Sequence, residues 1–168
     1  MLIPTRRRTW GAQGLTPYVR YNFKHDKISA LAILTVSPRR KRMGLYTQFQ
    51  RENFTAIHTV DFLRQLLRHL RGHVLLLWDG AAIHKGPVVQ RLLDRYPRLH
   101  VEPFPAYAPE LNPTEQVWNE FKGRTANGLP WDTNELHRDL DSQARRTRRS
   151  QDKLRSFIRI SDLPSPPW

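Results

Sequence analysis

The sequence predicts an α/β fold in which helices flank a mixed sheet. Residues 28–36 and 45–49 are rich in apolar and β-branched side chains, and Pro38 with a basic run separates them, which is typical of an antiparallel strand pair. Two further short apolar runs, 74–79 and 99–104, alternate with helix-like segments, which is typical of parallel strands joined by helices. Antiparallel strands followed by such units indicate one mixed sheet with helices on its faces.

The spacing of apolar residues predicts four helices, near residues 60–71, 87–96 and 113–123, and from about 133 into the basic run 145–149. Gly72 is a suitable C-cap for the first helix. Asn112 and Pro113 give the third helix a clear start, because asparagine is a favoured N-cap and proline fits the first helical position. We expect residues 18–23 to form a short strand and residues 161–168 a frayed tail.

Composition restricts the class of protein. The 168 residues are enough for one domain with a core, and without cysteine there is neither a disulfide nor a thiolate metal site. The net charge of +13 is uneven: +9 over residues 1–42, zero over 43–120 and +4 over 121–168. Basic ends around a neutral centre suit a polyanion such as nucleic acid. No apolar stretch reaches membrane-spanning length, so we expect a soluble intracellular protein with no membrane partner.

Two carboxylates carry the functional argument. Asp79 ends the apolar run 74–78, at the strand end where ligands and catalytic groups collect in α/β sheets. Glu115 begins the helix after the next strand. In a basic chain, two such acids suggest a metal-dependent enzyme acting on nucleic acid. Spacing alone leaves a second interpretation for each: Asp79 with Gly80 is a common turn pair, and Glu115 fits a capping box with Asn112.

The motifs around these acids resemble the catalytic core of mariner-type transposases, most closely their bacterial insertion-sequence branch. They read LWDGAAIH at 77–84 and PAYAPELNPTEQVW at 105–118, and PTRRRTWG at 4–11 is similar to a stretch of the same domain. The resemblance covers about residues 1–125. It implies a ribonuclease-H-like fold and an Asp-Asp-Glu triad that binds two magnesium ions, with manganese as a substitute.

The resemblance gives Asp79 and Glu115 the roles of second and third acid, both catalytic and both metal ligands. It places the first Asp at the end of a central strand that would precede this chain, and Asp26 is not in a position to replace it. We therefore expect an N-terminally truncated chain that alone has little or no activity. We also expect its antiparallel and parallel halves to be separated, with unpaired edges and marginal stability. The expected organisation is a partial catalytic domain at 1–125, a basic helical extension at 126–160 and the flexible tail.

Several other residues are candidates for auxiliary roles. His84 either contacts a scissile phosphate or orients a carboxylate, or is a surface or capping residue. Asn119 and Lys122 lie one and two turns after Glu115 on its helix face. Tyr107 either packs within its proline-rich loop or stacks on an extruded base.

DNA is the expected partner, as transposon ends and as target. The predicted phosphate contacts are Arg6, Arg7, Arg8, Arg39, Arg40, Lys41, Arg42, Arg145, Arg146, Arg148 and Arg149. The resemblance implies cleavage and strand transfer by a homodimer, or with a complementing transposase N-terminal chain, in the bacterial cytoplasm at the nucleoid. Two alternatives stay open: a non-enzymatic basic DNA-binding remnant that inhibits full-length transposase, and a stand-alone nuclease or resolvase.

Overall fold

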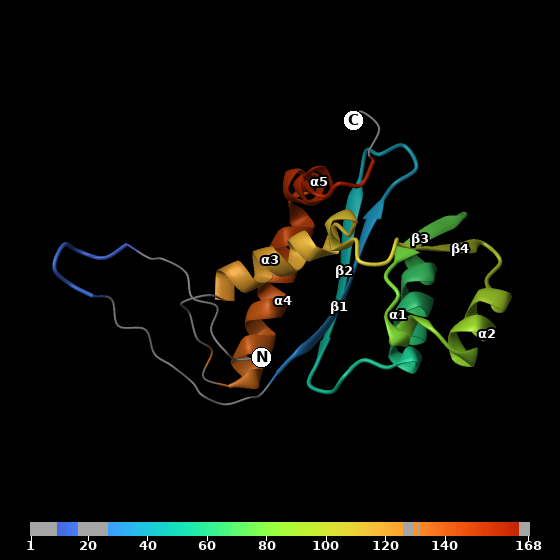
Figure 1. Ribbon diagram of the computed structural model, residues 1–168, viewed down its shortest axis with the longest axis horizontal. Coiled ribbons are helices and arrows are strands. Elements are labelled where there is room, and N and C mark those ends of the chain that lie inside the picture. The colour runs from blue at the N-terminus through green and yellow to red at the C-terminus, as the bar shows by residue number, and fades with distance from the viewer. Residues whose placement is uncertain (1–9, 17–26, 126–129, 131, 165–168) are drawn as a thin grey trace.

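The computed structural model describes residues 10–16, 27–125, 130 and 132–164 (Figure 1). Its strands are β1 (Ser29–Val36), β2 (Met43–Gln50), β3 (Val74–Trp78) and β4 (Leu99–Pro103). Its helices are α1 (Ala56–His69), α2 (Pro87–Arg95), α3 (Thr114–Thr125), α4 (Thr133–Arg149) and α5 (Gln151–Ile160), with short 3₁₀ turns η1 (Ala82–His84) and η2 (Pro109–Leu111). No described helix is both long and apolar enough to cross a membrane. The strand predicted at 18–23 lies outside the described residues.

The described strands form two separate ladders. β1 and β2 pair antiparallel, from Ser29 opposite Gln50 to Val36 opposite Met43. β3 and β4 pair in parallel, with Trp78 opposite Pro103 at their carboxyl ends. Each ladder has two strands, and no hydrogen-bonded pairing joins the two ladders within the described ranges. Among the described strands the antiparallel and parallel halves therefore form separate ladders.

The helices form layers on the two sides of these ladders (Figure 1). Helices α3, α4 and α5 cover one face of the β1–β2 ladder, while α1 and α2 lie on the other side. One apolar cluster contains α1 together with residues of both ladders, including Ile33 and Tyr46 from the first and Leu76 from the second. Helix α1 is therefore the element that holds the two ladders together.

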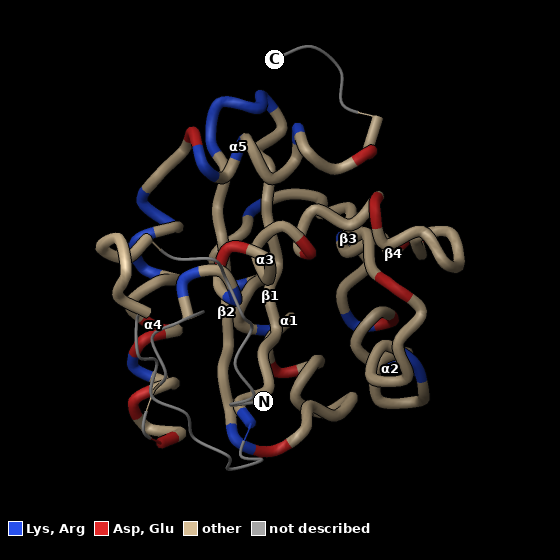
Figure 2. Tube along the Cα trace, turned by 60° about the vertical axis from the view of Figure 1, so that its left-hand side comes forward, with Lys and Arg blue, Asp and Glu red and all other residues tan. Residues whose placement is uncertain are grey.

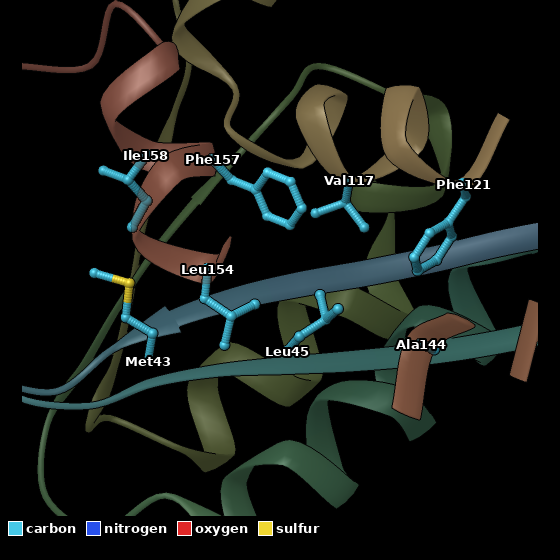
Figure 3. Packing of buried hydrophobic residues seen from close by; sticks show 8 residues of the cluster. All are labelled: Met43, Leu45, Val117, Phe121, Ala144, Leu154, Phe157 and Ile158. Carbon is cyan, nitrogen blue, oxygen red and sulfur yellow. The ribbon is translucent and has the colours of Figure 1, made fainter. Parts of the chain in front are cut away.

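The second apolar cluster joins β2 to the three C-terminal helices (Figure 3). Leu45 of β2, Val117 of α3 and Leu154 of α5 are almost fully inaccessible to solvent. The sequence predicted one final helix, but Ser150 ends α4 and its hydroxyl accepts the Lys153 N–H to begin α5. Because α5 supplies buried side chains to this cluster, it is part of the main fold.

Strand β3 differs from the fully buried strand that its apolar sequence predicts. Only Leu76 is buried, against α1, whereas Leu75 and Leu77 expose 65% and 39% of their surface. A continuous apolar run is typical of a strand covered on both faces and paired at both edges. In the described structure β3 has one strand neighbour and one helix-covered face.

Candidate functional site

Asp79 lies directly beyond the end of β3, as predicted. The Phe104 N–H donates to the Trp78 carbonyl at 2.7 Å, so the chain leaving β4 runs beside Asp79. Asp79 Oδ1 accepts the Ala81 N–H at 3.0 Å, an arrangement that fixes the side chain across the turn. The side chain is still more than half exposed. Asp79 is thus both a turn residue and an accessible carboxylate. Its structural role in the turn is compatible with a role as a metal ligand.

His84 is brought next to Asp79 by the η1 turn. Its Nε2 lies 3.6 Å from Asp79 Oδ1, too far for a hydrogen bond but close enough for an electrostatic contact. Its ring meets Trp78 edge to face, with centroids 4.6 Å apart. Its Nδ1 is buried and has no hydrogen-bond partner among the described residues. Burial lowers the pKa of His84 below its ordinary value, although the Asp79 carboxylate acts in the opposite direction. The ring beside Asp79 is therefore neutral at pH 7.

Glu115 lies in the first turn of α3, half-buried. Asn112 caps this helix as predicted, since its Oδ1 accepts the Thr114 N–H at 3.1 Å. The capping-box interpretation of Glu115 is wrong, because the Asn112 N–H donates to the Pro109 carbonyl at 3.0 Å instead. The backbone N–H of Glu115 donates to the Asn112 carbonyl at 3.1 Å, whereas its carboxylate makes no hydrogen bond or ion pair with any other described residue. Its carboxylate is therefore available for a ligand.

A further acid on α3, Glu120, has a structural role. Glu120 forms ion pairs with Arg124 and with Lys153, and so joins α3 to α5. Within the described ranges, no group of three or more His, Cys, Asp or Glu side chains is positioned to hold a metal ion. Asp79 and Glu115 thus remain the two candidate acids of the site. Asn119 and Lys122 are exposed on α3 and open to a ligand.

Tyr107 occupies an unusual position between these acids along the chain. Its backbone φ is +59°, a conformation that residues other than glycine adopt rarely, and its side chain is fully exposed. The prediction that it packs within its loop is wrong. The alternative, stacking on a base, is compatible with a ring that contacts nothing on either face.

Basic residues distant in sequence meet at one end of the molecule (Figure 2). The β1–β2 turn carries Arg39, Arg40, Lys41 and Arg42, and Arg155 of α5 donates to the Lys41 carbonyl at 3.3 Å. The exposed Arg145, Arg146, Arg149 and Arg159 belong to the same two C-terminal helices. Arg148 differs, because its Nε donates to the Leu45 carbonyl at 2.8 Å. We call the β1–β2 turn together with Arg145, Arg146, Arg149 and Arg159 the basic end. Arg6, Arg7 and Arg8 lie outside the described residues.

Sequence spacing did not reveal the contribution of Arg155 and Arg159, because both lie on α5, a helix that was not predicted. An amphipathic pattern at Leu154, Phe157 and Ile158 is the signal that would have located that helix. The contact between His84 and Asp79 likewise depends on the η1 turn, which leaves no periodic pattern in the sequence.

Both the sequence and the fold of the chain are similar to those of known proteins. Residues 1–137 match the family described as DDE superfamily endonuclease. No curated protein sequence matches the chain. The fold is similar to the Mos1 transposase paired-end complex with left transposon end, at 21% identity and a TM-score of 0.66, covering 96% of this chain and 48% of that one.

Two further Mos1 structures match. The Mos1 mariner paired-end complex with Mn has 19% identity and a TM-score of 0.67, covering 93% of this chain and 47% of that chain. The catalytic domain of Mos1 mariner transposase has 17% identity and a TM-score of 0.50, covering 86% of each. At such identities the likeness shows the fold, which is ribonuclease-H-like. The chain spans about half the length of the transposase chains in the two paired-end complexes.

Proposed function

Because the chain belongs to the DDE superfamily endonuclease family, we propose that it is the catalytic-domain part of a mariner-type DNA transposase of the bacterial insertion-sequence branch. The observation that carries this proposal is the pair of acids. Asp79 follows β3, Glu115 opens α3, and neither pairs with a lysine or arginine in the part of the chain that the structure describes. Both are therefore available as ligands and match the second and third acids of the triad.

The proposed reaction has two steps at phosphorus. In the first, a water oxygen attacks a phosphodiester at the transposon end, the bond between phosphorus and the 3′ oxygen breaks, and that oxygen leaves as a 3′-hydroxyl with the proton from water. In the second, this hydroxyl attacks a phosphodiester of the target DNA and releases the target's own 3′-hydroxyl. Transposon ends and target DNA are thus the proposed substrates.

The donor chemistry of the two acids suits Mg²⁺, or Mn²⁺ in its place, since both prefer oxygen ligands. A bound ion would supply Lewis-acid stabilisation of charge on the phosphate oxygens. The Ala81 N–H holds one oxygen of Asp79, which leaves the second oxygen without a hydrogen bond to any described residue. We propose that His84 further limits the rotation of Asp79, and that Asn119 and Lys122 assist on the α3 side.

Two carboxylates provide little charge for a pair of divalent ions. We therefore propose that the 168-residue chain alone has little or no activity. We propose that a further acid reaches the site from a complementing transposase chain or through assembly of a homodimer. Two ladders held together mainly by α1 support this proposal, because such a fold gains stability from a partner.

We propose the basic end as the main source of DNA affinity. Its arginines lie on a turn and on two helix surfaces, where they can contact DNA phosphates. Phosphate contacts of this kind contribute affinity but little recognition of base sequence. Arg6, Arg7 and Arg8 are proposed to add to it. A basic chain acting on DNA would work in the bacterial cytoplasm at the nucleoid.

Nicking of supercoiled DNA in Mn²⁺ tests the enzymatic role. We expect any nicking by the chain to disappear in Asp79→Ala and in Glu115→Ala, while both variants still bind DNA. Nicking that both variants retain in full would contradict the assignment of the two acids.

A second candidate is a non-enzymatic DNA-binding remnant that inhibits full-length transposase, and the extent of the basic end favours it. It would be supported if the chain and both variants bind DNA equally with no metal-dependent cleavage. A resolvase, in contrast, would prefer branched DNA to linear ends.

A further inference from the structure

We propose that the C-terminal part of the chain, α5 with Ser161–Asp162 after it, positions the Glu115 carboxylate in the candidate metal site. We call this segment the C-terminal brace. It contacts the chain on both sides of Glu115, at Glu110 in the η2 turn before it and at Glu120 on α3 after it. The inference rests on the proposed function, because the brace acts through the proposed metal ligand.

Helix α3 has few buried side chains to fix its orientation. Of its 12 residues, all of them described, only Val117 and Phe121 are buried. A rotation of about 20° about the helix axis would move a side-chain tip, which lies about 5–6 Å from that axis, by about 2 Å. A displacement of about 1 Å is enough to cost a catalytic group about 100-fold in rate. The position of Glu115 therefore depends on contacts that hold α3 against rotation.

The first contact of the brace lies along α3 itself. Phe157 of α5 and Val117 of α3 belong to one buried cluster (Figure 3), and Lys153 of α5 forms an ion pair with Glu120. The side chains of Lys153 and Glu120 are only 29% and 25% exposed, so salt screens this pair less than a pair on the open surface. Val117 and Glu120 lie three residues apart, on one face of α3. The apolar contact and the ion pair thus resist rotation of the helix together.

The second contact holds the η2 turn that leads into α3. The buried hydroxyl of Ser161 donates to the Ile158 carbonyl at 2.7 Å, where α5 ends. The backbone at Ser161 is extended, and the next N–H, that of Asp162, donates to the Glu110 carbonyl at 3.0 Å. Asn112, two residues after Glu110, caps α3. One main-chain hydrogen bond therefore ties the end of α5 to the segment that carries the N-cap of α3.

The hydrogen bond between Asp162 and Glu110 indicates a local role and not a contribution to the core. Both residues are exposed, so their contact buries little apolar surface. Its effect is to limit where η2 lies, and through Asn112 where the first turn of α3 begins. Loss of this bond should displace Glu115 without unfolding the protein, which distinguishes a positioning role from a merely structural one.

Proline at position 162 tests the second contact, since proline has no backbone N–H to donate. The extended backbone of Ser161 is the conformation that a residue before proline favours. We expect Asp162→Pro to weaken Mn²⁺ binding about tenfold in an electron paramagnetic resonance titration. We also expect the Asn112 and Glu115 amides to exchange hydrogen about tenfold faster, because their turn loses its anchor. The matched control, Asp162→Ala, keeps the N–H and should match wild type in both measurements.

Substitution of Lys153 tests the first contact. Lys153→Met keeps an unbranched side chain but removes the charge, and we expect it to weaken Mn²⁺ binding about tenfold. Lys153→Arg can still pair with Glu120 and should restore the binding. Arg64→Met removes the same charge and an ion pair with Asp61 from α1, and should leave Mn²⁺ binding unchanged. Circular dichroism at the temperature of the titration checks that each variant is folded.

The outcomes separate positioning from stability and from the proposed function. Equal behaviour of Asp162→Pro and Asp162→Ala in both measurements would overturn the proposal, as would a Lys153→Met variant that melts earlier but binds Mn²⁺ like wild type. If wild type binds no Mn²⁺, the proposed metal site fails, and hydrogen exchange then decides the role of the brace alone. Faster exchange at Glu115 in Asp162→Pro, but not in Asp162→Ala, would support the brace, and unchanged exchange would overturn it.

Discussion

Replacement of Leu154 by alanine is expected to destabilise the fold by about 3 kcal/mol. Leu154 lies on α5 with 0% of its surface exposed, in the cluster that contains Leu45 and Val117. The substitution removes three carbon atoms, each worth about 0.8 kcal/mol when buried, or about 2.4 kcal/mol together. The cavity left behind adds to this, and measured leucine-to-alanine losses in cores run from about 2 to 5 kcal/mol. Such a loss is a large fraction of the stability of an ordinary domain.

The assay is urea unfolding followed by circular dichroism. The matched control is Ile160→Ala in the same helix, where the side chain is 61% exposed and a change within about 0.5 kcal/mol is expected. In a thermal melt the Leu154→Ala loss corresponds to about 6–12 °C. A loss below about 1 kcal/mol, or one equal to that of Ile160→Ala, would refute the reasoning that α5 belongs to the main core.

Three further predictions concern single side chains. Burial alone would raise the pKa of Glu120, but hydrogen bonds from its basic partners lower it, so its ion pairs stabilise the fold at neutral pH and are lost as pH falls below the ordinary value of 4.5. In urea melts, the free energy of unfolding of wild type should therefore exceed that of Glu120→Gln by about 0.5–1 kcal/mol at pH 7 and should equal it at pH 3. The same difference at both pH values would contradict a stabilising role of these ion pairs. His84→Ala should weaken Mn²⁺ binding about tenfold by freeing Asp79, and unchanged affinity in a calorimetric titration would exclude this positioning role. Tyr107→Ala should weaken binding to single-stranded DNA by about 1–3 kcal/mol in fluorescence anisotropy, whereas equal affinity would exclude base stacking.

The strands and most helices could be predicted because their apolar residues recur at regular spacing. Residues 28–36 and 45–49 were expected as an antiparallel pair, and β1 and β2 form one with boundaries close to these. Helix α1 begins at Ala56, earlier than predicted, because the Thr55 N–H bonds to His58 and starts the helix before its apolar stripe.

The positions of the candidate acids were predicted in part. Asp79 and Glu115 lie where motif and spacing placed them, after β3 and in the first turn of α3. The hydrogen bond of the Asn112 N–H to the Pro109 carbonyl was not predicted, because the η2 turn lies in a proline-rich stretch. The exposure of Leu75 was not predicted either. An apolar run predicts a buried strand, but it does not identify the neighbouring elements that would cover that strand. Contacts between segments far apart in sequence, such as Arg155 with the β1–β2 turn, arise from tertiary packing alone.

The central claim is that Asp79 and Glu115 form a divalent-metal site in a DNA-acting domain. Titration of the chain with Mn²⁺, followed by electron paramagnetic resonance, tests it most directly, with Asp79→Asn and Glu115→Gln compared with the unrelated Asp61→Asn on α1. We predict that wild type and Asp61→Asn bind Mn²⁺ equally, and that each of the other two variants binds more than about tenfold more weakly. Equal Mn²⁺ binding by all four proteins would contradict the claim.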